Sequence, residues 1–160
     1  MRPKITMTVK DRGWKKINDL YNRLRNGKIY VKAGVLSGSD SRSDTMDNVT
    51  LALIHEFGTG DGRIPARSFV RSTFADNRPN YEAQLKQVVV KAFGKDPDLL
   101  IKGLNLIGLA MASDMKKRIT LGAGVPPPNA PSTIKAKGSS RPLVDTGQLV
   151  RSITHAVVEE

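Results

Sequence analysis

The sequence has no cysteine, only two histidines and few aromatic residues. The lack of cysteine excludes a disulfide scaffold, a zinc ribbon, an iron–sulfur site and a thiol nucleophile. Two histidines disfavour a His-rich metal site. Aromatic residues make up 5% of the 160 residues, so we expect a mainly aliphatic core.

Long apolar runs are also missing. No segment approaches the roughly 18 uninterrupted apolar residues of a membrane helix, and the first residues lead into no apolar signal-peptide segment. We therefore expect a soluble protein that is assembled in the cytosol. The length fits a single domain covering residues 1–160, because domains usually contain about 100–200 residues.

Positive charge is the strongest bulk property of the chain. It has 26 Lys and Arg against 15 Asp and Glu, a formal net charge of +11. Residues 1–28 hold nine basic and two acidic side chains, a net charge of +7. This basic end suggests a polyanion or an acidic protein surface as a partner, and a solvated helix face is the alternative interpretation.

Hydrophobic periodicity predicts an α+β domain with strands towards both ends and helices between them. Expected strands at 4–9, 28–36 and 151–158 form a small mixed or antiparallel sheet that pairs the N- and C-terminal strands. Expected helices cover residues 12–26, 47–57, 68–78, 80–95, 97–120 and 133–137. The helix at about 97–120 is the longest, and Gly108 four residues before Ala112 suggests close helix–helix approach there.

The basic N-terminal strand and helix (1–28) are expected to have an apolar and a charged face. Helical spacing directs Trp14, Ile17, Leu20 and Leu24 inward. It leaves four basic side chains on the surface, Lys15, Lys16, Arg23 and Arg25.

Two segments have the composition of loops that connect helices and strands. Residues 37–48 are small and polar and predict a mobile loop. Residues 122–132 contain three consecutive prolines, which favour polyproline II, so we expect an extended, semi-rigid arm.

Catalytic motifs are incomplete. His55-Glu56 begins like a zinc-protease helix, but position 59 is Thr where the second His is needed. We favour the interpretation that His55 lies at a helix end beside Glu56, and that hydrogen bonds satisfy the Glu56 carboxylate. The glycines at 58, 60 and 62 follow a helix, which disfavours a dinucleotide site. We predict no catalytic, cofactor-binding or metal-ligating residues, and no enzyme.

Three segments together resemble the tailed-bacteriophage virion-morphogenesis proteins, which are neck, tail-completion and tail-terminator components. The segments are ALIHEFGTG at 52–60, IPARSFVRSTF at 64–74, and PSTIKAKGS followed by RPLVDTGQLVRSI within 131–153. In the Mu-type members the Asp-Thr-Gly-x-Leu block comes first, and the order here is more similar to the siphophage tail-completion group. Ser68 departs from the proline common in relatives, and residues 1–28 have no counterpart.

The resemblance implies a structural virion protein at the neck or tail end. Such proteins form rings, usually sixfold, which need head-to-tail contacts between copies. The implied partners are other copies of the chain, the tail tube protein and head–tail connector proteins, together with non-specific contact with genomic DNA. No cofactor and no membrane are implied.

The residues of these motifs are expected to have mainly core and turn roles. Phe57, Phe69 and Phe74 are expected to anchor the loop that Gly58 begins, and Pro65 to fix a backbone angle within it. A second group forms a tight turn, in which the side chains of Asp145 and Thr146 accept backbone N–H groups and Gly147 supplies unusual dihedral angles. Exposed arginines are the candidate subunit interface, namely Arg63, Arg67 and Arg71.

Two other functions remain open. The basic end favours a nucleic-acid-binding protein, although no recognition-helix motif, zinc finger or aromatic stacking platform is present. A hydrolase would depend on His55-Glu56 alone. Within the virion interpretation a minor tail component is a further alternative. The charged face with Lys15, Lys16, Arg23 and Arg25 is predicted to line the ring channel or the seam with an adjoining ring.

Overall fold

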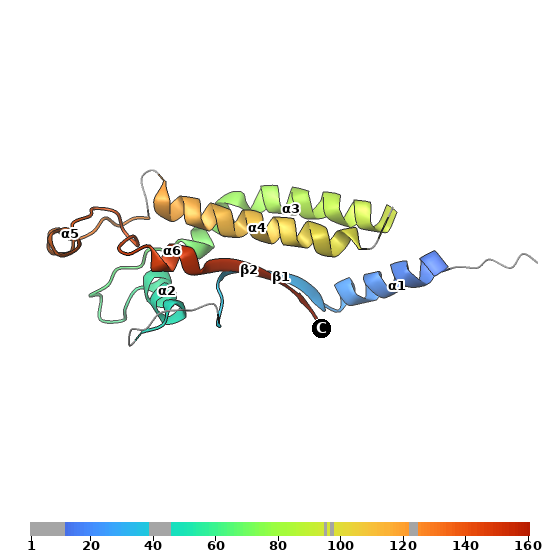
Figure 1. The fold of residues 1–160 in the computed structure, drawn as a ribbon, viewed down its shortest axis with the longest axis horizontal. Helices are drawn as coiled ribbons and strands as arrows, with labels where there is room; N and C mark the ends of the chain where they lie inside the picture. The colour runs from blue at the N-terminus through green and yellow to red at the C-terminus, as the bar shows by residue number, and fades with distance from the viewer. Residues whose placement is uncertain (1–11, 39–45, 95, 97, 122–124) are drawn as a thin grey trace, which may run out of the picture.

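The computed structural model describes residues 12–38, 46–94, 96, 98–121 and 125–160. The expected strand at 4–9 and most of the loop at 37–48 lie outside these residues. The elements, in chain order, are α1 (Arg12–Arg25), β1 (Ile29–Val35), α2 (Asn48–Phe57), α3 (Val70–Gly94), α4 (Leu99–Thr120), α5 (Pro131–Lys137), α6 (Gln148–Ser152) and β2 (Ile153–Glu159). This is the expected α+β class, and Figure 1 shows an elongated molecule with α5 at one end and α1 at the other.

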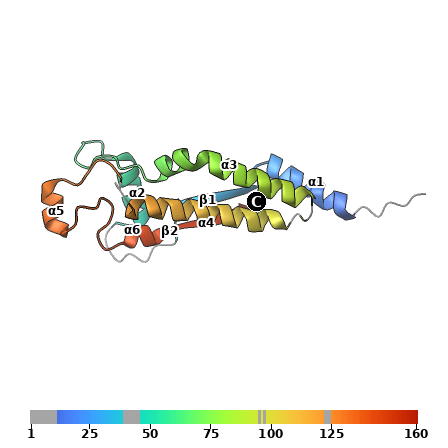
Figure 2. The ribbon, with the colours of Figure 1, turned by 90° about the horizontal axis from the view of Figure 1, so that it is seen from above.

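The two described strands pair as predicted. β1 and β2 run antiparallel over their full length, from Ile29 opposite Glu159 to Val35 opposite Ile153. α4 packs on both strands and α3 packs on α4. Seen from above, the two long helices lie side by side (Figure 2).

Glycines in α4 allow close packing on two sides. A Cβ at Gly103 would come within 2.3 Å of a methyl carbon of Val88 on α3, and one at Gly108 within 2.6 Å of the His155 ring on β2. The close helix–helix approach expected at Gly108 is therefore found at Gly103, because Gly108 faces the sheet. Helical periodicity gives the spacing of small residues but not the element that they meet.

Pro79 does not divide α3, contrary to expectation. The helix is continuous from Val70 to Gly94. Pro79 removes one backbone donor, but Pro79 and Ala75 are exposed, so water can bind the carbonyl that loses its partner. Packing along α4 on both sides of the proline, including a hydrogen bond from Tyr81 to Asp114, outweighs this local cost.

α1 has the predicted extent but not the predicted burial. Leu20 is buried, yet the Trp14 side chain is 67% exposed and α1 projects from the body of the molecule (Figures 1 and 2). Trp14 and Tyr21 line a shallow hollow with Phe93 at the end of α3. Helical spacing identifies residues on one face without showing that another element covers the whole of it.

The core consists of two clusters. One joins α1, β1, α3 and α4 around Leu20 and Leu100. The other joins α4 to the C-terminal segment around Phe69, Val125 and Ile153, and it supports the end of the molecule that carries α2, α5 and α6. Within the described ranges, no helix combines the length and the hydropathy that crossing a bilayer requires.

Candidate functional site

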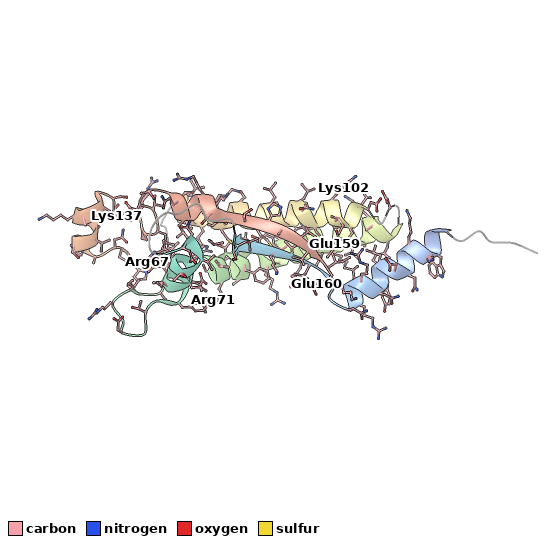
Figure 3. The ribbon with its side chains drawn as sticks, turned by 60° about the horizontal axis from the view of Figure 1, so that its bottom comes forward. Arg67, Arg71, Lys102, Lys137, Glu159 and Glu160 are labelled. Carbon is pink, nitrogen blue, oxygen red and sulfur yellow. The ribbon has the colours of Figure 1, made fainter. Side chains whose placement is uncertain are left out.

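A cleft of about 620 Å³ lies at the α5 end of the molecule. Its walls come from α2, the loop before α3, the segment 127–130, α5 and the turn before α6. These are the parts of the chain in which the three resembling segments lie. His55 belongs to the first segment, Arg67 to the second and Lys137 to the third, and Figure 3 shows Arg67 and Lys137 at this end.

α2 has the ends that the sequence predicts. The Asp47 side chain accepts a hydrogen bond from the backbone N–H of Thr50 (2.6 Å), and this bond is the main cause that lowers the pKa of Asp47. Gly58 ends the helix at φ 76°. A Cβ at Gly58 would come within 2.8 Å of the backbone of Ile64 and Ala66, so the turn requires glycine.

Backbone hydrogen bonds hold the loop that follows α2. The N–H of Thr59 donates to the carbonyl of Ile64 (2.9 Å), and the Ile64 N–H donates to the Thr59 hydroxyl (3.0 Å). The Arg67 N–H donates to the carbonyl of His55 (2.6 Å). Pro65 lies within this loop and lines the cleft, and its expected role in fixing the backbone stays a prediction.

Of the three predicted aromatic anchors, only Phe69 has the burial that this role requires. Phe69 is fully buried, whereas Phe57 is 59% and Phe74 46% exposed. The Arg71 guanidinium lies 4.6 Å above the centre of the Phe57 ring, and Phe74 packs against Tyr81. Backbone hydrogen bonds, and not Phe57 or Phe74, join the loop to α2.

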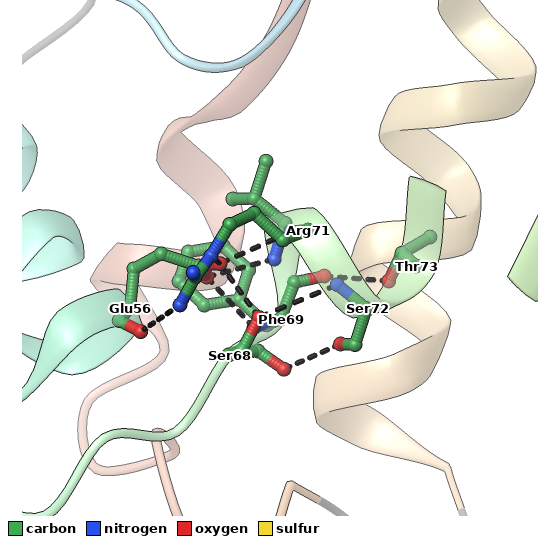
Figure 4. Close-up of polar contacts among 7 residues, drawn as sticks. Glu56, Ser68, Phe69, Arg71, Ser72 and Thr73 are labelled. Atoms are coloured by element: carbon green, nitrogen blue, oxygen red, sulfur yellow. Dashed lines mark hydrogen bonds and ion pairs between the residues drawn. The ribbon is translucent and has the colours of Figure 1, made fainter. Parts of the chain in front are cut away.

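Glu56 joins α2 to the beginning of α3. Its carboxylate is buried, with the residue 5% exposed, and accepts five hydrogen bonds (Figure 4). The donors are Ser68 Oγ (2.6 Å), the backbone N–H groups of Phe69 (2.9 Å), Val70 (3.0 Å) and Arg71 (3.1 Å), and Arg71 Nε (2.9 Å). Glu56 thus caps α3 from another helix and places a negative charge at its positive end.

The pKa of Glu56 reflects these contacts. Burial alone would raise it, but hydrogen bonds from Ser68, Val70 and Arg71 outweigh burial and lower the pKa to about 2. The prediction that hydrogen bonds satisfy the Glu56 carboxylate is therefore confirmed. The Ser68 hydroxyl takes part in the same cap, since it also accepts a hydrogen bond from the Ser72 N–H (3.3 Å).

Arg67 is buried, which corrects its assignment as an exposed interface residue. It is 7% exposed, and Nε and Nη2 donate to the carbonyls of Pro127 (2.8 Å) and Pro128 (3.0 Å). Burial lowers its pKa. A contact between residues 60 positions apart leaves no local signal in the sequence.

The proline-rich segment is bound to its own chain at Val125, Pro127 and Pro128, within its described part. Val125 lies in the core, and residues 125–127 bend where an extended arm was expected. The extended, semi-rigid arm predicted for residues 122–132 is therefore not found at residues 125–128, because Arg67 binds the carbonyls of Pro127 and Pro128.

Lys137 holds the loop after α5, which forms another wall of the cleft. Its ammonium donates to the carbonyls of Arg141 (2.6 Å) and Val144 (2.7 Å), which holds the loop after α5. Leu143 in this loop is buried and has a φ of 61°, a value that costs a leucine backbone energy. Sequence reasoning missed Lys137 because its partners are backbone carbonyls, which any sequence supplies.

Two polar atoms of the cleft are buried without a hydrogen-bond partner. They are His55 Nδ1 and Gln148 Oε1. Burial, followed by the charges of Arg67 and Lys137, lowers the pKa of His55, so its ring is neutral at pH 7. Gln148 was not singled out in the sequence, since an isolated Gln carries no spacing signal.

The turn before α6 is only partly as predicted. Gly147 has a φ of 78°, as expected for a residue that supplies unusual dihedral angles. Within the described residues, the side chains of Asp145 and Thr146 accept no backbone N–H. The turn is instead held by Arg151, whose Nη2 donates to the Thr146 carbonyl (3.1 Å).

The remaining predicted charges lie in different places. Arg63 lines the cleft and pairs with Asp61 (3.2 Å), while Arg71 is bound to Glu56. Lys15, Lys16 and Arg25 are exposed on α1 at the other end of the molecule. Arg23, predicted on the surface, is only partly exposed, and its Nη2 lies 2.6 Å from Glu159 Oε2 on β2.

Over the parts of the chain that the structure describes, no three His, Asp or Glu side chains are grouped as metal ligands would be. Comparison with family models, curated proteins and solved structures gives no match.

Proposed function

We propose that the chain is a structural protein of a tailed-bacteriophage virion that acts without catalysis at the neck or tail end. The supporting observation is that the three resembling segments, separated in the sequence, form one cleft through His55, Arg67 and Lys137. In this proposal the copies form a closed ring, and the ring joins the tail tube protein to head–tail connector proteins.

Exposed apolar side chains support assembly into such a ring. Trp14 on α1, Phe57 on α2 and Leu106 on α4 are each more than half exposed, on widely separated elements. A ring requires two different surfaces on each copy, and exposed apolar side chains on three different helices supply candidates for these surfaces.

Electron microscopy and light scattering of the purified chain test the proposal. We expect a closed ring, alone or on purified tails, and Leu106→Glu or Phe57→Glu to reduce ring formation. Lys102→Glu is the matched control, because Lys102 is exposed on the same helix as Leu106. A chain that stays monomeric with purified tails and is absent from virions contradicts the proposal.

A nucleic-acid-binding protein is the second candidate, favoured by the exposed Lys15, Lys16 and Arg25 of α1. Titration of duplex DNA at several salt concentrations separates the two. Binding tighter than about micromolar at physiological salt, with sequence preference, favours this candidate, and weak salt-sensitive binding favours the ring.

A further inference from the structure

The cleft at the α5 end contains two cations without an acidic partner. Arg67 is buried and Lys137 is half-buried, and the groups that they bind are neutral backbone carbonyls. Within the described residues, neither forms an ion pair with a carboxylate. Arg67 is removed from water and bound by neutral groups, so it attracts an anion more strongly than an exposed arginine does. Lys137 adds a second positive charge at the same cleft.

The same cleft contains an unused acceptor. Gln148 Oε1 is buried without a donor, and His55 Nδ1 beside the two cations is buried without a partner. Buried polar groups are nearly always hydrogen-bonded, so two exceptions in one cavity point to a ligand. A fitting ligand supplies a hydrogen-bond donor for Gln148 Oε1 as well as negative charge.

The rest of the wall suits a chain with apolar side chains. Leu51, Ile64 and Leu149 line it, and its volume of about 620 Å³ lies within the range of ligand-binding pockets. Asp145 is the single acidic residue among the described lining residues, so the basic residues outnumber it.

We propose that this cleft binds an acidic segment of a partner polypeptide in an extended conformation. Carboxylates of the segment face Arg67 and Lys137, and a backbone N–H donates to Gln148 Oε1. A peptide fits better than a nucleic acid because it carries backbone N–H donors close to its carboxylates. The N–H donors of a nucleic acid lie on its bases, and the described lining includes no Phe, Tyr or Trp on which a base could stack. The proposal holds whether or not the chain belongs to a virion.

Nuclear magnetic resonance of the full chain with short peptides tests it. The probes are acetyl-Glu-Leu-Glu-amide, the neutral acetyl-Gln-Leu-Gln-amide and the basic acetyl-Lys-Leu-Lys-amide. We expect the acidic probe alone to produce saturable shifts of the His55 ring and the Gln148 side-chain amide. Absence of saturable shifts, or equal shifts with the neutral probe, overturns the proposal, as does a short oligothymidylate that binds in the cleft more tightly than the acidic probe.

Substitution of Gln148 separates binding from folding. Gln148→Met keeps the size of the side chain and removes an acceptor that has no partner, so thermal stability should be unchanged or higher. Affinity for the acidic probe should fall roughly tenfold, the effect of losing one hydrogen bond in a buried site. Gln87→Met is the matched control, because Gln87 is exposed on α3 outside the cleft. Unchanged affinity in Gln148→Met, or an equal loss in Gln87→Met, overturns the proposal.

Charge substitutions give an independent measurement. Lys137→Gln should weaken binding of the acidic probe, whereas Lys135→Gln on the exposed side of α5 should leave that binding unchanged. Because Lys137 also holds the loop after α5, folding of this variant is checked by its amide spectrum. A folded Lys137→Gln variant with full affinity contradicts the proposed role of the cation.

Discussion

Arg71 binds both the side-chain carboxylate and the backbone carbonyl of Glu56. Its Nε lies 2.9 Å from the Glu56 carboxylate, and its Nη2 donates to the Glu56 backbone carbonyl (3.1 Å). These two contacts therefore hold the C-terminal end of α2 against the N-terminal end of α3. The cleft wall that includes His55 depends on this junction, because His55 directly precedes Glu56.

Glu56→Gln should destabilise the protein by about 2–3 kcal/mol at pH 7. The amide keeps one acceptor, but its NH₂ group would face N–H donors, and the negative charge at the helix end is lost. Urea unfolding measures the change. Glu82→Gln is the control, because Glu82 is exposed and its pair with Arg78 should contribute less than about 1 kcal/mol. Equal effects of the two substitutions would show that the Glu56 contacts add little stability.

Stability should fall in acid because of the same carboxylate. The pKa of Glu56 is about 2 in the folded chain, below the ordinary value of 4.5, so folding favours the charged form. Its contribution is present above pH 4.5 and is lost as pH falls from 4.5 towards 2, by on the order of 3 kcal/mol in total. Unfolding free energies of the wild type and Glu56→Gln should therefore converge over this range. A constant difference between pH 7 and pH 3 would contradict the assignment.

Local features of the fold follow from neighbouring residues and were predictable. Asp47 and Gly58 mark the ends of α2 through contacts within one turn, and period-two alternation identifies β1 and β2. The cleft was not predictable in the same way. It depends on contacts such as that between Arg67 and Pro127, in which neither partner has a distinctive sequence neighbourhood.

Burial was the property that sequence reasoning judged least well. Trp14 and Phe57 were expected to be inside, but both are more than half exposed, because the neighbouring elements cover them only in part. Arg67 shows the reverse. Its charge predicted an exposed side chain, but it is buried because the carbonyls of Pro127 and Pro128 accept its hydrogen bonds. Amphipathic spacing determines which side chains lie together, whereas burial depends on how distant segments pack.

Gly103→Ala should destabilise the protein by about 1–3 kcal/mol, although alanine favours a helix by about 1 kcal/mol over glycine. The new Cβ would come within 2.3 Å of Val88 on α3 and force the two helices apart. Val88→Ala in the same chain should recover part of the loss, which a double-mutant cycle measures by urea unfolding. Gly13→Ala on α1 is the control, since a Cβ there has no neighbour within 4 Å and should cause no loss. Additive effects at Gly103 and Val88 would exclude the predicted contact.

The basic face of α1 should act in assembly and not in folding. Lys15 and Lys16 are exposed, so Lys15→Glu with Lys16→Glu should change the free energy of unfolding by less than about 0.5 kcal/mol for each position. Arg23→Glu should differ, because it places a carboxylate against Glu159, which Arg23 now binds at 2.6 Å. If the lysines line a ring channel or seam, reversing their charge repels DNA or an acidic partner across a distance of about 8–10 Å. The double variant should then give fewer joined, DNA-filled particles while keeping the wild-type unfolding curve. Full yield of infectious particles from the double variant would show that this charge is only a solvated helix face.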